Sequence, residues 1–250
     1  QATTDLAEAP KSPLEGRHEE ARAVIETLTR PEGRGKSVLL VGEEGAGKRA
    51  LVDTLARDMA EKRYKGLEDT RVYEFDVSRV VGGNVEQLAN QLRTLVAKSK
   101  GKVILFIDGP DHLKNQALNE HNFFKIAARG MERGDLNLIV SAKPAERRLL
   151  AEKGPFPFET VELAAPSVEK SAAMLEAHAP ALSERYGVTA GRGLFEAAAR
   201  LAARYLPRAV LPGSALDVLE RVYAAASRNS RLNRIETESR RRLERLSRYL

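Results

Sequence analysis

Apolar residues along the chain fall into two kinds of pattern. Short continuous apolar runs predict strands that are buried on both faces of a sheet. These runs lie at 37–41, 72–76, 103–108, 136–140 and 161–163. Apolar residues at helical spacing separate the runs, at 16–28, 51–59, 88–95 and 123–131. Strands that alternate with helices predict an α/β fold with a parallel sheet, whose ligand crevice lies at the carboxyl ends of the strands.

The pattern changes after Pro166, where only helical spacing remains, at 168–177, 194–203 and 215–226. This change divides the chain into expected parts. Residues 1–13 lack periodicity and are expected to form a linker or disordered lead-in. We then expect a large α/β domain at 14–164, a small helical domain at 165–228 and a basic helix at 229–250. Leucines at heptad spacing in the last segment predict a helix that packs on the body or begins a coiled-coil arm.

The positive charge is concentrated at the end of the chain. The net charge is +6, and residues 228–250 contain eight Arg and three Glu, which place +5 there. The body is therefore close to neutral, and we do not expect a nucleic-acid partner. The chain has no cysteine and no apolar run of membrane-spanning length. These two features fit a reducing, cytoplasmic setting without a membrane partner.

The stretch Ser37–Arg49, SVLLVGEEGAGKR, carries the clearest chemistry. A strand, a glycine loop, a lysine and a helix follow one another in the order that a phosphate-binding P-loop requires. The loop backbone N–H groups and the helix N-terminus bind an anion, and Lys48 reaches the outer phosphates. The next residue in a P-loop is Ser or Thr, whose hydroxyl helps to hold Mg²⁺. Here it is Arg49, which brings a cation to the metal position.

The sequence therefore predicts ATP or ADP as the ligand, with no ordinary Mg²⁺ site. Asp108 ends the run 103–108 at the same sheet edge and is the expected ligand if Mg²⁺ binds at all. Arg49 either pairs with a β-phosphate or contacts Asp108 across the crevice and closes the pocket. The expected nucleotide contacts are Gly42, Glu43, Glu44, Gly45, Ala46, Gly47, Lys48, Arg49, Asp108 and Lys143.

Several landmarks along the chain resemble the first AAA+ module of Clp-type unfoldases and disaggregases, the ClpA, ClpB and ClpC group. They are Gly16-Arg17, the run 103–108, the segment 165–169, Tyr205-Leu-Pro207 and the segment 211–217, in family order. The resemblance covers residues 14–228. It implies a P-loop AAA+ domain followed by an all-helical lid, nucleotide binding, and self-association or association with other AAA+ subunits. The protein partner stays unknown.

The resemblance also shows where this chain departs from the family. The family has a catalytic Glu after the Walker B Asp, and here Gly109 follows Asp108, leaving Asp111 as a substitute candidate. The arginine-finger triplet corresponds to Phe156-Pro157-Phe158, and the lid lysine corresponds to Ser214. The pore loop corresponds to 80–85, which has no aromatic residue.

We therefore expect a Clp-like module with impaired hydrolysis, which serves nucleotide binding, ring assembly or partner contact in a larger chaperone-like protein. Asp108 and Asp111 are the only candidate catalytic residues. Two alternatives stay open. One is an active but atypical ATPase that uses Arg49, Asp111 and Lys143. The other is a nucleic-acid-binding AAA+ protein that uses the basic C-terminal helix.

Overall fold

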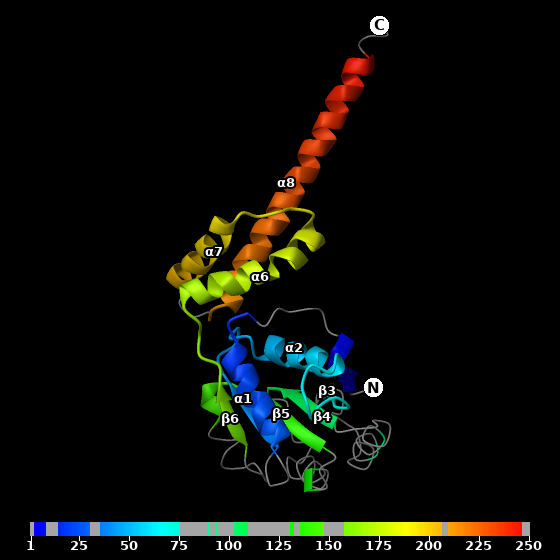
Figure 1. The fold of residues 1–250 in the computed structure, drawn as a ribbon. Helices are drawn as coiled ribbons and strands as arrows, with labels where there is room; N and C mark the ends of the chain where they lie inside the picture. Colours follow the sequence, from blue (N-terminus) through cyan, green and yellow to red (C-terminus); the bar gives the residue numbers. More distant parts are fainter. Residues whose placement is uncertain are drawn as a thin grey trace. The chain divides into compact units, whose positions relative to one another are not determined.

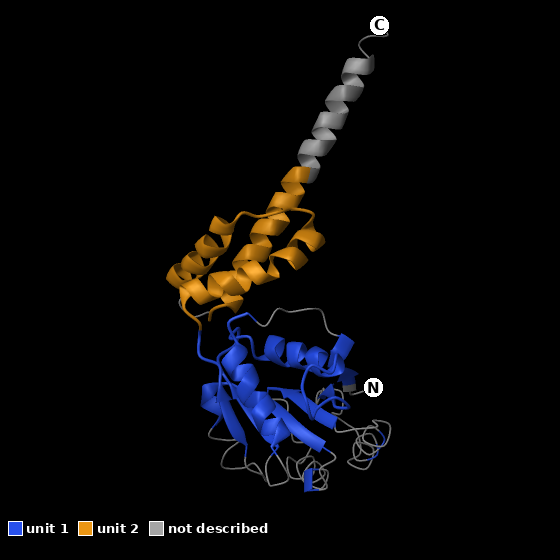
Figure 2. Ribbon diagram, viewed as in Figure 1, with its two compact units in different colours: residues 1–165 blue, residues 166–250 orange. Residues whose placement is uncertain are grey.

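The computed structural model divides the chain into two compact units, residues 1–165 and 166–250 (Figure 2). It describes residues 3–8, 15–30, 36–75, 90, 94, 103–109, 131–132, 136–147, 158–206 and 210–246, and from residue 231 on it describes only the backbone. No described helix is long and apolar enough to cross a membrane.

The first unit is built on a sheet in which the described strands have the order β1-β3-β4-β5-β2-β6 (Figure 1). The strands are β1 (Thr3–Asp5), β2 (Ser37–Val41), β3 (Arg71–Phe75), β4 (Val103–Asp108), β5 (Leu136–Ala142) and β6 (Glu159–Glu162). Strands β2 to β6 pair in parallel, which confirms the predicted fold class. β5 continues two residues beyond its predicted end, and β6 begins two residues before its predicted start.

Burial follows strand position in this sheet. All residues of β2 and β5 are buried, as are the first five of β4, because these strands lie inside the sheet and are covered on both faces. β6 lies at an edge and has one buried residue. Helix α1 (His18–Thr29) packs against β2 and β6, and helix α2 (Lys48–Ala60) packs against β3. The predicted helices at 88–95 and 123–131 lie largely outside the described residues, although Asn90, Thr94 and Met131 are helical.

The prediction of a linker or disordered lead-in at residues 1–13 is wrong for residues 3–8. β1 pairs antiparallel with β3, with Thr3 opposite Phe75, and the short 3-10 helix η1 (Leu6–Glu8) follows it. The side chain of Leu6 is buried. The edge of β3 offers unpaired backbone N–H and C=O groups, which this short segment satisfies. A strand of three residues is too short to show a period in the sequence.

The second unit consists, in its described part, of α6 (Val168–Tyr186), α7 (Arg192–Tyr205) and α8 (Gly213–Leu246). Their shared core contains Leu175, Phe195, Ala199, Leu219 and Tyr223. The hydroxyl of Ser167 accepts a hydrogen bond from the backbone N–H of Lys170 and caps the first turn of α6.

The predicted helix 215–226 and the described part of the predicted basic helix, 229–246, are one continuous helix, α8 (Figure 1). Asn229 and Ser230 stand at the expected boundary, and neither residue excludes helical backbone as proline does. The basic segment therefore begins inside the helical unit as a direct extension of a packed helix.

Candidate functional site

The candidate site lies where β2, β4 and β5 end at one edge of the sheet. In the parallel register, Val41 pairs with Ala142 and Asp108 pairs with Ser141. The backbone N–H of Gly42 donates to the carbonyl of Ala142 at 3.0 Å, which ties the start of the loop to the end of β5. The glycine loop, Asp108 and Ser141 are therefore brought to one place, although they are far apart in the sequence.

Glycine is required in the loop for two different reasons. Gly45 and Gly47 have φ of +85° and +92°, values that side-chain-bearing residues rarely adopt. Gly42 is required by close approach, because a Cβ there would lie 2.8 Å from the carbonyl oxygen of Leu163. Helix α2 begins directly after this loop, so its N-terminal N–H groups belong to the site.

Lys48 lies over the loop that precedes it. Its Nζ donates to the carbonyl of Gly42 at 2.6 Å and to that of Glu43 at 2.9 Å. Burial lowers the pKa of Lys48, while the nearby carboxylates of Asp108 and Glu43 oppose that shift. A phosphate oxygen in place of these carbonyls would favour the charged lysine more strongly than they do.

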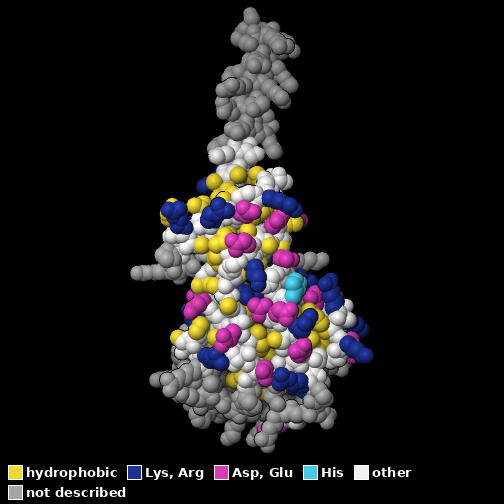
Figure 3. All heavy atoms as spheres, turned by 60° about the vertical axis from the view of Figure 1, so that its left-hand side comes forward, with side chains coloured by type: hydrophobic (Ala, Val, Ile, Leu, Met, Phe, Trp, Pro, Cys, Tyr) yellow, Lys and Arg dark blue, Asp and Glu magenta, His cyan; other side chains and the backbone are white. Residues whose placement is uncertain are grey.

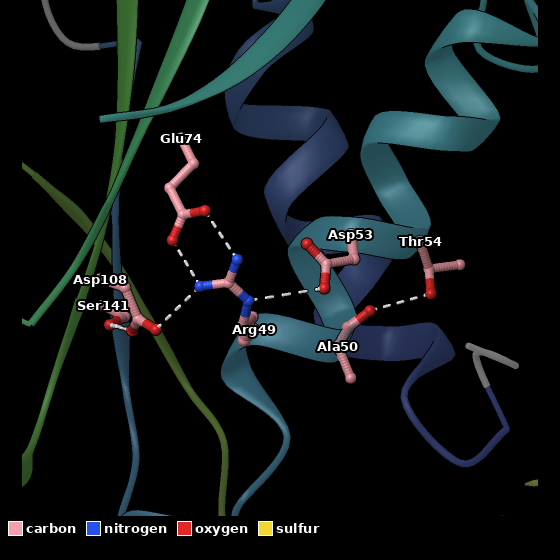
Figure 4. A network of polar contacts seen from close by, with 7 residues as sticks. All are labelled: Arg49, Ala50, Asp53, Thr54, Glu74, Asp108 and Ser141. Atoms are coloured by element: carbon pink, nitrogen blue, oxygen red, sulfur yellow. Dashed lines mark hydrogen bonds and ion pairs between the residues drawn. The ribbon is translucent and has the colours of Figure 1, made fainter. Parts of the chain in front are cut away.

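The guanidinium of Arg49 is surrounded by three carboxylates (Figure 4). Its Nη2 donates to Oε2 of Glu74 at 2.7 Å, and its Nη1 donates to Oε1 of the same residue. Nη1 also lies 3.6 Å from Oδ2 of Asp108, and Nε lies 3.8 Å from Oδ2 of Asp53. The pKa of Arg49 is raised, first of all by the hydrogen bonds to Glu74. Arg49 therefore makes the contact with Asp108 that one of the two alternatives left open by the sequence requires, while closure of the pocket stays a prediction.

Asp108 is also held on its other oxygen. The hydroxyl of Ser141 donates to Oδ1 of Asp108 and accepts a hydrogen bond from the backbone N–H of Gly109 at 3.1 Å. Gly109 has a φ of +80°, which turns the chain at the end of β4. Both oxygens of this carboxylate therefore face groups of the protein itself.

Asp53 completes the network from helix α2. Burial is the main cause of its raised pKa, and Arg49 only partly offsets that shift. Its Oδ1 is buried and has no hydrogen-bond partner within the described part of the chain. The guanidinium of Arg49 thus interacts with Glu74, Asp53 and Asp108, while Arg57 also acts on Asp53 and Lys48 on Asp108.

Two further cations lie near the loop. Nζ of Lys143, just after β5, lies 3.2 Å from Oε2 of Glu44, so this pair spans the loop. Arg17 is buried, and its Nη2 donates to the carbonyl of Ala46 at 3.0 Å and to that of Ala164 at 2.8 Å. Arg17 therefore joins the loop to the chain that follows β6. This contact gives the arginine of the Gly16-Arg17 landmark a structural role.

The remaining sequence-based candidates do not join this site in the described structure. Asp111, the segment 80–85, Phe156 and Pro157 lie outside the described residues. Arg147, close in sequence to the position of the arginine fingers, forms an ion pair with Glu162. Ser214 is buried in the helical unit.

Glu74 and Asp53 are two site residues that the sequence analysis did not predict. The contact of Asp53 with Arg49 could have been predicted from the sequence, because residues four apart on a helix lie side by side and these two have opposite charges. The sequence indicated Glu74 less clearly, only as a charged residue in the middle of a predicted strand. Its partner could not be identified, because the contact depends on how α2 packs against β3.

The residues at this site do not fit a magnesium ion. Mg²⁺ needs about six oxygen ligands at close to ideal octahedral geometry. Here the residue after Lys48 has no hydroxyl, and Arg49 places its charge beside Asp108.

Figure 3 shows how charge is distributed over one face of the described residues; the side chains from residue 231 on, which the nucleic-acid alternative uses, lie outside them. Over the described residues of that face, Lys and Arg side chains are interspersed with Asp and Glu side chains. Nucleic-acid-binding domains instead gather Lys and Arg into a patch or stripe. The face drawn there has no such patch in its described part.

Family models match both units of the chain. Residues 38–130 match the ATPase family associated with various cellular activities (AAA), and residues 167–249 match the AAA lid domain. Among curated proteins, the chaperone protein ClpB of Enterococcus faecalis is 29% identical over 239 residues, which cover 91% of this chain. The AAA+ ATPase ClpV1 of Pseudomonas aeruginosa is 30% identical over 260 residues, which cover 98% of this chain.

Solved structures of the yeast protein Hsp104 have the same fold. A complex of S. cerevisiae Hsp104 with casein superposes with a TM-score of 0.79 and 27% identity, covering 92% of this chain and 41% of the Hsp104 chain. The Hsp104–ADP complex superposes with a TM-score of 0.81 and 28% identity, covering 96% of this chain and 36% of that chain. This chain spans 27% of the length of the E. faecalis ClpB and 29% of that of ClpV1.

Proposed function

This chain carries an AAA domain and an AAA lid domain and is homologous to Clp-type AAA+ ATPases over 91% of its length; on this basis we propose that it binds ATP or ADP but hydrolyses ATP poorly. The module serves nucleotide binding, and through it self-association or contact with other AAA+ subunits, within a larger chaperone-like protein. The ligand contacts run from Gly42 to Arg49, with Asp108 and Lys143 at the rim.

The observation that carries this proposal is the guanidinium of Arg49 among Glu74, Asp53 and Asp108 (Figure 4). Hydrolysis in P-loop enzymes depends on a metal ion that bridges the outer phosphates and on a group that orients the attacking water. The metal position holds a protein cation here, and Gly109 stands where the water-orienting Glu would be. Loss of a general base alone lowers a rate by about 10²–10⁴, or roughly 3–5 kcal/mol in the barrier.

Binding is proposed because the anion-binding parts of the loop are all present. Gly45 and Gly47 have the left-handed backbone that turns successive N–H groups toward one anion. Lys48 stands at the start of α2, beside the loop carbonyls it would exchange for phosphate oxygens. The yeast relative Hsp104, solved as an ADP complex, binds a nucleotide of this class.

Calorimetric titration with ATP and ADP, combined with a phosphate-release assay, tests the proposal. We expect both nucleotides to bind to the wild type, and we expect Lys48→Ala to weaken this binding by about tenfold or more. Phosphate release by the wild type should be no faster than phosphate release by Lys48→Ala. Lys170→Ala, at an exposed position of α6, is the matched control and should bind as the wild type does. Turnover of about 1 s⁻¹ or faster that disappears in Lys48→Ala would overturn impaired hydrolysis. Absence of any nucleotide binding would overturn the function itself.

A further inference from the structure

Building on the proposed function, we propose that the P-loop of this chain selects the metal-free form of its nucleotide, and that Glu74 sets this selectivity by holding Arg49 in the metal position. The ligand class is an uncomplexed nucleoside di- or triphosphate. Glu74 is a specificity-determining residue that acts through Arg49 and touches no phosphate itself.

The first support is the geometry of the Arg49–Glu74 pair. Both oxygens of Glu74 accept a hydrogen bond from the same guanidinium, so the pair is bidentate. Bidentate pairing fixes the guanidinium in direction as well as position. Glu74 is carried by β3, a strand of the sheet, whereas Arg49 stands in the first turn of α2. The pair therefore fixes Arg49 against the sheet edge.

The second support is the number of carboxylates that Arg49 engages. Asp53 approaches its Nε, and Asp108 approaches its Nη1. If Arg49 moved away to admit a metal ion, Glu74 would lose its bidentate partner, and the largely buried Asp53 would keep only the weaker effect of Arg57. Removing one partner from a partly buried charge network is unfavourable because the other charges are left without compensation.

The third support is the state of Asp108. Ser141 donates to Oδ1 of Asp108, and Arg49 lies nearest to Oδ2. A Mg²⁺ ion that arrived with the nucleotide would meet a guanidinium on one side and an already engaged carboxylate on the other. A bare polyphosphate brings no second cation that would compete with Arg49 for the carboxylates of Glu74, Asp53 and Asp108.

The test is calorimetric titration of ADP and ATP into the chain, first in EDTA and then in excess Mg²⁺. We expect the wild type to bind at least about tenfold more tightly in EDTA, which corresponds to ~1.4 kcal/mol. Arg49→Thr restores the hydroxyl and should reverse the preference in favour of the Mg²⁺ complex. The ratio of the dissociation constant in Mg²⁺ to that in EDTA should be closer to one in Glu74→Gln than in the wild type. The reason is that the bidentate hydrogen bonding to the guanidinium is lost.

Two controls match these variants in chemistry. Arg22→Thr and Glu19→Gln lie on the exposed face of α1 and should leave the ratio of the two dissociation constants unchanged. That ratio separates a specific effect of Glu74 from a general loss of stability, which would weaken binding equally in both buffers. Thermal unfolding of each variant shows whether it is folded.

The possible outcomes separate this inference from the function on which it rests. If the wild type binds as tightly, or more tightly, with Mg²⁺, metal-free selectivity is overturned while nucleotide binding stands. If Glu74→Gln keeps the full wild-type ratio, the role of Glu74 is overturned. If the wild type binds no nucleotide in either buffer, the proposed function fails, and metal-free selectivity fails with it.

Discussion

Ser141 and Asp108 face each other across the neighbouring strands β5 and β4, and the hydroxyl of Ser141 donates to the carboxylate of Asp108. The same hydroxyl accepts the backbone N–H of Gly109, so one side chain fixes both the carboxylate and the turn after it. The direction of Asp108 is therefore set from inside the sheet as well as by Arg49.

Ser141→Ala should lower the free energy of unfolding by about 1–2 kcal/mol, because Asp108 and Gly109 both lose a hydrogen-bond partner. Urea unfolding measures this change. Ser230→Ala, at an exposed position of α8, is the control and should stay within about 0.5 kcal/mol of the wild type. Equal effects of the two variants would show that the hydroxyl of Ser141 does not stabilise this edge.

Arg17→Ala should be more damaging, with a loss of roughly 2–4 kcal/mol in the free energy of unfolding. The buried carbonyl of Ala46 and the partly buried carbonyl of Ala164 would each lose a charged donor. The loop should also hold its shape less well, so nucleotide affinity should fall. Arg22→Ala on the same helix is 69% exposed at its side chain and serves as the comparison. The proposed anchoring of the loop is wrong if both variants unfold at the same urea concentration.

Gly42→Ala should destabilise the chain by about 1–3 kcal/mol, because the added Cβ would press against the backbone oxygen of Leu163. Backbone cannot move aside as a flexible side chain can. Gly193→Ala offers the contrast, since a Cβ there meets nothing within 4 Å and the residue lies in α7. It should stabilise the helical unit by up to about 1 kcal/mol. Thermal unfolding of both variants checks the pair, and a neutral Gly42→Ala would contradict the close approach.

Asp53→Asn should have a pH-dependent effect on stability. Burial raises the pKa of Asp53 above its ordinary value of 3.8, against the opposing charge of Arg49 and with Glu74 and Asp108 nearby. Between 3.8 and the raised value, the folded state holds more protons than the unfolded state, so the Asp53 contribution to stability falls as pH rises. The unfavourable contribution is absent below the ordinary value and complete above the raised one.

The stability of Asp53→Asn relative to the wild type should therefore improve as pH rises from about 4 to neutral. Urea unfolding at a series of pH values measures this trend. A difference between the two proteins that does not change with pH would show that burial does not raise the pKa of Asp53. Asp58→Asn, the same substitution on the same helix, is the control.

The parts of the site that the sequence predicted are those fixed by local chemistry. The loop from Gly42 to Lys48 follows from spacing alone, because its turn and its helix start depend on neighbouring residues. Asp108 could be placed at the same edge, because parallel strands end together. The sheet could be predicted from the continuous apolar runs, because such runs are typical of strands that are buried on both faces.

The parts that the sequence did not predict depend on contacts between distant segments. Glu74 meets Arg49 only because α2 packs against β3, and no periodicity encodes that approach. The strand Thr3–Asp5 exists because the edge of β3 is there to pair with it. Helix α8 continues through Asn229 because no strong helix breaker stands there. The change to a basic composition near this residue had instead suggested a boundary between two helices.

Helix α8 has a mechanical consequence. Its first turns contribute Ala215, Leu219 and Tyr223 to the packed core of the second unit, and its backbone continues without interruption to Leu246. Thirty-four helical residues make a rod about 50 Å long. A tilt of ~10° at its packed end would sweep the far end through roughly 9 Å, at the rise per residue of an α-helix. A small change in the packing of Ala215, Leu219 and Tyr223 would thereby become a much larger displacement at the far end of the helix.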